Sequence, residues 1–230
     1  VPALQTRRRL SHVVRFDVPT YAKPLLLTDA VLHAAPTLAE KADIARNAMD
    51  LARIMGVETP RVAVLSAAEE IDASVPSSID AASLCKMAER GQIAGGLIDG
   101  PLAFDSAVSA QSAHDKHPQS PVAGQADVLL APDMETASIL GRQLQYRAGA
   151  TASGLIMGAR VPIALVKHRK DTANAYLAAA LAGLGVTQMV TFMAAPHLAS
   201  GALVPVLPGW KTPPIPVHVV YPPNRHLSAK

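Results

Sequence analysis

Short, continuously apolar segments alternate with helix-like segments along most of this chain, and that alternation constrains its fold more than any other feature. Strands that are apolar throughout, rather than at every second residue, are typical of sheets covered on both faces. The pattern therefore predicts an α/β fold, a three-layer α/β/α domain with a mainly parallel sheet that C-terminal strands extend. The expected strands are residues 25–28, 61–66, 94–99, 126–132, 152–158 and 161–166.

The segments between the expected strands carry helix start and stop signals. Thr37 is followed three residues later by Glu40, the spacing of a capping box, and Ser77 or Ser78 is expected to cap the second helix. The polar segment 109–121, with two histidines and two prolines, is expected to be an irregular loop. Helices are expected at 35–56, 76–91 and 133–149.

Polar residues follow the predicted strands at one edge of the sheet. Asp29, Ser66, Asp99 and Asp133 all stand where a strand ends, and ligands of open α/β sheets gather outside these carboxyl ends. Asp99-Gly100-Pro101 is therefore expected to form a tight loop after a central strand. Asp99 either orients neighbouring groups or part of a ligand, or it only caps the segment that follows.

Composition excludes several classes of function. Half of the 230 residues are hydrophobic and 17% are charged, which favours an ordered core over disorder. With 3% aromatic residues and a net charge of only +3, the chain lacks the stacking residues and the basic groove of a nucleic-acid binder. Because no apolar segment approaches the roughly 20 residues that span a bilayer, no membrane association is expected.

Metal and redox chemistry receive little support from the sequence. Cys85 is the single cysteine and lies in an apolar helical pattern, so a buried structural thiol in a reducing cytoplasm is expected. His114 and His117 have a spacing that suits a metal, but no neighbouring ligand set completes a site. Gly183 and Gly185 lack the rest of a dinucleotide-binding motif. We therefore expect neither a metal site nor a permanently bound cofactor.

Long stretches of the chain resemble the phosphate acetyltransferase and phosphate butyryltransferase family. The resemblance is carried by "FDVPTYAKPLLLTDA", "VPSSIDAASLCKMAERGQIAGGLIDGPLAFDSAVS", "SPVAGQADVLLAPDMETASIL" and "AGATASGLIMGARVPI", in that order, over about residues 8–165. It implies acyl transfer between coenzyme A and inorganic phosphate, with coenzyme A or acyl-CoA, acyl phosphate and phosphate as substrates. Family members have two α/β domains around a cleft. The matching part resembles the second, so turnover is expected to be impaired without the first.

The resemblance also implies site residues. The family follows "VPI" with a Ser-Arg-x-Asp-like segment, which places Arg169 and Asp171 in catalytic positions, with His168 in place of the serine. Helix amides, arginines and hydroxyl groups suit phosphate oxygens and the oxyanion of acyl transfer. Each residue also has an ordinary structural interpretation as a cap, a turn or a surface charge. The residues expected to bind substrate are Ser77, Ser78, Asp99, Gly100, Asp133 and Arg160.

The tail resembles a different family. Residues from about 172 to 230, with "LAGLGVTQ", "APHLASGALVPVLPGW" and "PPIPVHVVYPPNRHLSAK", are similar to the effector-binding region of LysR-type transcriptional regulators. The expected division is an acyltransferase-like domain at 8–170 and a LysR-like segment at 171–230 that packs on it or completes it. A chimeric, non-catalytic ligand-binding module is thus the alternative to an enzyme. Apolar surface left by the unrepresented first domain favours a homo-oligomer.

Overall fold

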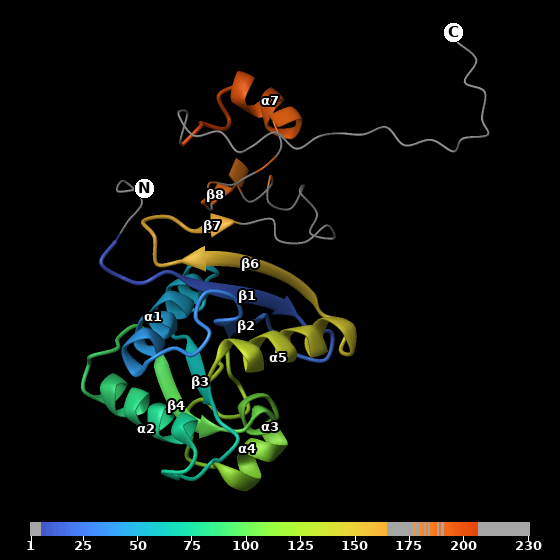
Figure 1. Ribbon diagram of the computed structural model, residues 1–230. Helices are drawn as coiled ribbons and strands as arrows, with labels where there is room; N and C mark the ends of the chain where they lie inside the picture. Colours follow the sequence, from blue (N-terminus) through green and yellow to red (C-terminus); the bar gives the residue numbers. More distant parts are fainter. Residues whose placement is uncertain are drawn as a thin grey trace, which may run out of the picture.

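The computed structural model describes residues 6–164 and 191–206, and residues 177, 180, 181, 183, 185–187 and 189 between them. Within this part an eight-stranded sheet has the order β4-β3-β5-β2-β1-β6-β7-β8 (Figure 1). The strands are β1 (Ser11–Asp17), β2 (Leu25–Thr28), β3 (Arg61–Leu65), β4 (Leu97–Leu102), β5 (Val128–Leu130), β6 (Thr151–Met157), β7 (Ile163–Ala164) and β8 (Val186–Thr187).

The sheet is mixed, with a parallel and an antiparallel half. Strands β4, β3, β5 and β2 pair in parallel, whereas β1 is antiparallel to both β2 and β6, and β7 is antiparallel to β6. Strand β8 then pairs in parallel with β7 and extends the sheet, as predicted for the C-terminal strands. The α/β class predicted from the alternation is confirmed.

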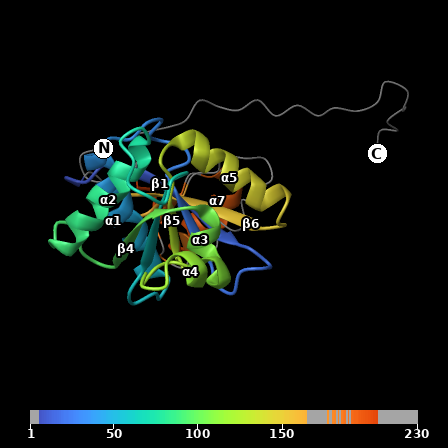
Figure 2. The same ribbon diagram turned by 90° about the horizontal axis from the view of Figure 1, so that it is seen from below.

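Helices cover both faces of the sheet. Helices α1 (Leu38–Ile54) and α2 (Pro76–Glu89) lie over one face, where they pack on side chains such as Leu26 and Val128. Helices α3 (Phe104–Val108), α4 (Ala110–Lys116) and α5 (Met134–Tyr146) lie over the other face, where Leu27 and Leu129 point (Figure 2). Adjacent residues of one strand thus reach different cores, which explains why these strands are apolar throughout.

Local signals at α1 behave as predicted. The Thr37 hydroxyl accepts from the Glu40 amide, and the Glu40 carboxylate accepts from the Thr37 amide, so the capping box is complete. The chain leaves the helix at Gly56 with a φ of +94°, a backbone conformation that glycine adopts without the usual steric cost.

Two segments differ from the prediction. Strand β1 was not expected, yet it occupies the middle of the sheet. It was missed because four of its seven residues, Ser11, His12, Arg15 and Asp17, are polar. The expected loop 109–121 contains helix α4: Ser109 caps it by accepting from the Ser112 amide, and Ala113 packs into the core. Both prolines lie after this helix, where they do not interrupt it.

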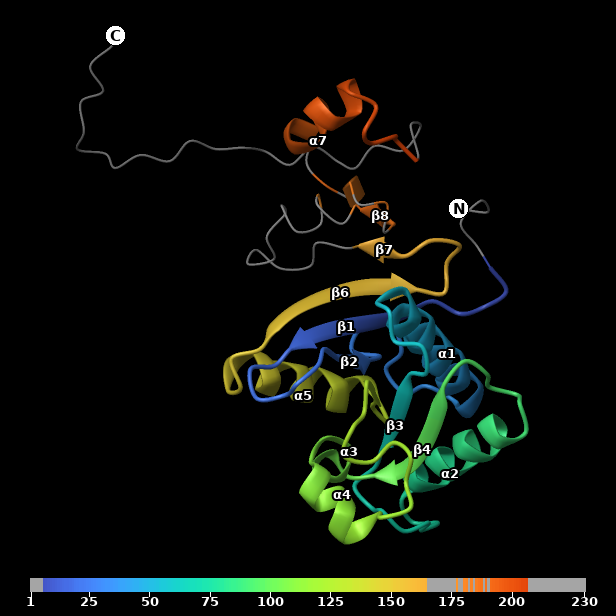
Figure 3. The same cartoon turned by 180° about the vertical axis from the view of Figure 1, so that it is seen from behind.

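The C-terminal elements of the described part lie at the edge of the sheet opposite β4. Figure 3 shows β7, β8 and helix α7 (Thr191–Ala199) beyond β6. The proline-rich segment 213–222 of the tail lies outside the described residues, as does the predicted boundary near residue 170 between the two resembling regions. None of the described helices combines the length and hydropathy needed to cross a membrane.

Candidate functional site

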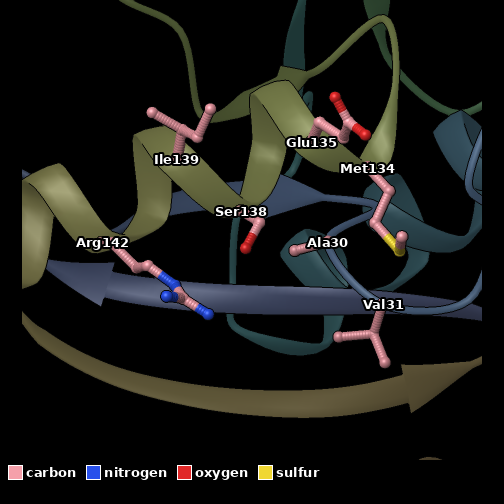
Figure 4. Close-up of a pocket in the computed structure, with 7 residues that line it drawn as sticks. All are labelled: Ala30, Val31, Met134, Glu135, Ser138, Ile139 and Arg142. Atoms are coloured by element: carbon pink, nitrogen blue, oxygen red, sulfur yellow. The ribbon is translucent and has the colours of Figure 1, made fainter.

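A pocket opens at the carboxyl ends of β2 and β5, the edge at which polar residues were predicted to gather. It has a volume of about 470 Å3 and lies between the loop after β2 and one side of helix α5 (Figure 4). The loop supplies Ala30 and Val31. The lining residues on the helix are Met134, Glu135, Ser138, Ile139 and Arg142.

The loop wall of the pocket is held by a buried carboxylate. The side chain of Asp29 is only 1% exposed. One of its oxygens accepts from the amides of Val31 and Leu32 at 2.8 and 3.0 Å. The other lies 2.8 Å from the ring Nδ1 of His33. These contacts fold the loop back on itself, so Asp29 positions the pocket wall without pointing into the pocket.

The helix wall begins with another structural carboxylate. Asp133 is the N-cap of α5, and its side chain accepts from the Thr136 amide at 2.7 Å. The preceding backbone is anchored to the β2 loop, because the Met134 amide donates to the carbonyl of Ala34. Asp133, predicted to bind substrate, therefore sits beside the pocket with its carboxylate engaged in capping.

The pocket itself combines apolar and polar side chains. Ser138 and Arg142 lie one helical turn apart and point toward the same space, whereas the carboxylate of Glu135 points away from Arg142 (Figure 4). Val31 and Ile139 provide apolar surface. Such a pocket accepts a ligand with one anionic group and one apolar part.

Ser77 and Ser78 lie at the start of α2, but neither caps it. The N-cap is Val75, and Pro76 occupies the first helical position, where its fixed φ and missing amide are tolerated. The buried Ser78 hydroxyl donates to the carbonyl oxygens of Asp72 and Val75. Ser77 Oγ lies 2.9 Å from the Oγ of Ser66, which follows β3, so a residue predicted to bind substrate does meet a residue of the predicted sheet edge.

Asp99 and Gly100 lie inside an edge strand, contrary to the predicted loop after a central strand. Asp99 pairs with Ala63 of β3, and Leu102 pairs with Leu65; the register shifts at a bulge between these two pairs. The Asp99 side chain accepts from the Gly100 amide and from the Ser120 hydroxyl. It does not cap the segment that follows, since α3 has Ala103 as its N-cap without a side-chain bond.

Cys85 behaves as a structural thiol. Its Sγ lies 3.4 Å from the Gly100 carbonyl oxygen. Burial, aided by the negative charges of Asp99 and Glu89, raises the pKa of the Cys85 thiol to about 12. The nucleophilic thiolate is therefore not formed at neutral pH.

An ionic cluster, formed by Glu69, His117, Lys116 and Asp105, ties α4 to the loop after β3. The Glu69 carboxylate lies 3.0 Å from His117 Nε2 and 3.2 Å from Lys116 Nζ, and it accepts from the Ala103 amide at 3.1 Å. Burial alone would raise the pKa of Glu69, but the surrounding hydrogen-bonding groups outweigh burial and lower that pKa to about 2. The folded protein thus favours the ionised carboxylate.

Glu69→Gln is expected to lower the free energy of unfolding by about 1–2 kcal/mol at neutral pH, a value reduced for the partial exposure of the cluster. Since folding lowers the pKa from 4.5 to about 2, the stabilisation is complete above pH 4.5 and disappears as the pH falls toward 2. Urea unfolding across this range measures it. The exposed Glu89→Gln variant should show little change at any pH. A Glu69→Gln difference that stays constant with pH would contradict the assignment.

The remaining predicted site residues are not brought to the pocket. Arg160 is exposed in the turn between β6 and β7 and is not among the lining residues. Arg169 and Asp171 lie outside the described residues, as does His168. Sequence reasoning missed Ser138 and Arg142; their spacing of four residues is the only local signal, and it is common in helices.

Within the part of the chain that the structure describes, no group of three or more His, Cys, Asp or Glu side chains could hold a metal ion. His114 and His117 are on or next to α4, and His117 is engaged with Glu69.

Comparison with known proteins identifies relatives over most of the chain. The family model described as phosphate acetyl/butaryl transferase matches residues 2–182. A phosphate acetyltransferase of Rhizobium meliloti is 47% identical over 181 residues, which are 79% of this chain and 57% of that protein. A phosphate butyryltransferase of Clostridium acetobutylicum is 39% identical and covers 78% of this chain and 61% of its own length.

Solved structures agree with this comparison. A branched-chain phosphotransacylase from Enterococcus faecalis superimposes with a TM-score of 0.67 and 33% identity, over 74% of this chain and 60% of that one. A phosphotransacetylase from Streptococcus pyogenes gives a TM-score of 0.61 and 26% identity, over 70% and 48% of the two chains. The chain thus spans between about half and three fifths of the length of these relatives.

Proposed function

This chain belongs to the phosphate acetyl/butaryl transferase family, and we propose from this membership that it takes part in acyl transfer between coenzyme A and inorganic phosphate. The observation that carries the proposal is the family match over residues 2–182. The pocket at the carboxyl ends of β2 and β5 supports it, since α/β sheets bind ligands at that edge.

In the proposed reaction, the thiol sulfur of coenzyme A forms a bond to the carbonyl carbon of an acyl phosphate. The carbon–oxygen bond to phosphate then breaks, phosphate leaves, and the thiol proton passes to a base. We assign the base to Asp171 and the neutralisation of phosphate charge to Arg169, because the family resemblance places both residues in these roles. His168 stands where the family has serine, so hydrogen bonding by a hydroxyl is replaced by that of an imidazole.

Several residues are proposed to help substrate binding indirectly. We assign Ser78, Asp99 and Asp133 to positioning, because their side chains bond to neighbouring backbone or side-chain groups. Gly100 allows two strands to approach closely. We keep Ser77 and Arg160 as candidates for direct contact with substrate, Ser77 near the end of β3 and Arg160 in an exposed turn.

The test is formation of acyl phosphate and free coenzyme A from acetyl-CoA or butyryl-CoA plus phosphate. We expect phosphate-dependent release of the thiol, a lower kcat in Asp171→Asn, and a higher KM for phosphate in Arg169→Gln. The neighbouring Lys170→Gln is the matched charge control and should retain both constants. Thiol release that does not require phosphate, or equal activity in all three variants, would contradict the proposal.

A second candidate is a non-catalytic ligand-binding module whose tail derives from a LysR-like effector region. The observation in its favour is the resemblance of residues from about 172 to 230, supported by the pairing of β8 with β7 in one sheet. Coenzyme A binding without any turnover separates this candidate from the first. We place either form in the cytoplasm as a homo-oligomer, because the chain has a single cysteine and exposes Phe192 and Val204.

A further inference from the structure

We propose that Ser138 and Arg142 form a binding site for a phosphoryl group in the pocket between the β2 loop and α5. The inference rests on the proposed function, because acyl phosphates, inorganic phosphate and coenzyme A all carry such groups. It adds two residues that neither the sequence patterns nor the family resemblance singled out.

The polar groups of both side chains are uncommitted. Within the described part of the chain, the Arg142 guanidinium makes no hydrogen bond or ion pair and the Ser138 hydroxyl makes no hydrogen bond. By contrast, other arginines such as Arg8, Arg15 and Arg46 are paired with carboxylates. Arg142 therefore has its planar set of donors available to a ligand.

The side chains of Ser138 and Arg142 converge on one space. Residues four apart on a helix lie on one side of it, about 5–6 Å apart at their Cβ atoms. Figure 4 shows that Ser138 and Arg142 point into the same space, with Ala30 and Val31 across from them. A phosphoryl group between the two side chains would accept two hydrogen bonds from the guanidinium and one from the hydroxyl, the geometry that favours arginine in phosphate recognition.

The charge around the pocket also favours an anionic ligand. The single lining carboxylate, Glu135, points away from Arg142 in Figure 4, and the nearby Asp133 is turned toward the amide of Thr136. Asp29 behind the loop is committed to Val31, Leu32 and His33. Among the lining residues, Arg142 is thus the charged one that faces the space between α5 and the β2 loop, and the apolar surface of Ala30 and Val31 would contact an uncharged part of the same ligand.

Two sources could supply the phosphoryl group: the small substrates, or the phosphate esters of coenzyme A. Titration calorimetry on the full chain with inorganic phosphate, acetyl phosphate, coenzyme A and 3′-dephospho-coenzyme A distinguishes them. If the small substrates are the source, Arg142→Gln weakens binding of phosphate and acetyl phosphate. If the coenzyme is the source, Arg142→Gln weakens binding of coenzyme A: a larger loss for coenzyme A than for 3′-dephospho-coenzyme A identifies its 3′-phosphate, and an equal loss identifies its diphosphate.

We expect Arg142→Gln to weaken binding of the phosphoryl ligand by about 10- to 100-fold and Ser138→Ala by about 3- to 10-fold, as for hydrogen bonds to charged groups. Arg147→Gln is the matched control, because Arg147 ends the same helix outside the pocket and its loss should leave all affinities unchanged. Circular dichroism verifies that each variant is folded.

The proposal is overturned if the parent chain binds none of the four ligands, or if Arg142→Gln and Arg147→Gln change affinity equally. Its failure is distinct from failure of the acyltransferase proposal. If turnover depends on phosphate but Arg142→Gln leaves both turnover and ligand binding unchanged, the acyltransferase proposal stands and this site is refuted. If the chain shows no turnover but its phosphate binding depends on Arg142, this site stands and the acyltransferase proposal fails.

Discussion

Replacing Asp29 by alanine is expected to lower the free energy of unfolding by about 3 kcal/mol and to remove ligand binding in the pocket. The change deletes a buried carboxylate that accepts from the amides of Val31 and Leu32 and contacts His33. The loop would lose the bonds that fold it, and Val31 would no longer form the wall opposite Arg142. Urea unfolding and calorimetry with phosphate measure the two effects.

Two variants control for this experiment. Asp29→Asn keeps an oxygen acceptor and should recover part of the stability. Asp17→Ala removes an exposed carboxylate paired with Arg15 and should lower the free energy of unfolding by less than about 1 kcal/mol. Equal destabilisation by Asp29→Ala and Asp17→Ala would show that the loop does not depend on the buried carboxylate.

Gly100→Ala is expected to destabilise the protein by about 2–3 kcal/mol, as for overpacked cores. A Cβ atom at this position would lie 2.7 Å from the carbonyl oxygen of Val64 and 3.0 Å from its Cβ. Because Val64 belongs to the adjacent strand β3, the pair of strands would have to separate at the bulge. Thermal unfolding provides the measurement.

Gly149→Ala is the matched control for Gly100→Ala. Gly149 has a φ of +66°, but no atom lies within 4 Å of an added Cβ. Its substitution therefore carries only the backbone penalty of the left-handed region, about 1–2 kcal/mol. If Gly100→Ala proves no more harmful than Gly149→Ala, close contact with Val64 is not what requires glycine.

The sequence by itself determined the features that depend on neighbouring residues. The capping box of α1 joins Thr37 and Glu40 across three positions, so the pattern of letters contains the whole interaction. Apolar segments long enough for strands but too short for helices predicted the α/β class. The rule that ligands gather at strand carboxyl ends placed Asp29 and Asp133 beside the pocket, although it did not reveal that both carboxylates bond to backbone amides.

Tertiary structure alone decided what depends on residues far apart in the chain. Strand β1 was hidden because its place between β2 and β6 follows from pairing across more than a hundred residues with β6. Asp99-Gly100-Pro101 has the composition of a turn, yet pairing with β3 keeps it in an edge strand. Local preferences are worth fractions of a kcal/mol per residue, so strand pairing and burial override them.

The same reason applies to the pocket and to the ionic cluster. Val31 and Arg142 line one pocket only because β2 and β5 are adjacent in the sheet, and Glu69 contacts His117 only because the end of α4 lies beside the loop after β3. Neither pair has a sequence signal, because its two members lie far apart in the chain: 111 residues separate Val31 from Arg142, and 48 separate Glu69 from His117. The sequence determined the elements that carry local signals; packing decided the remaining elements and which side chains share a site.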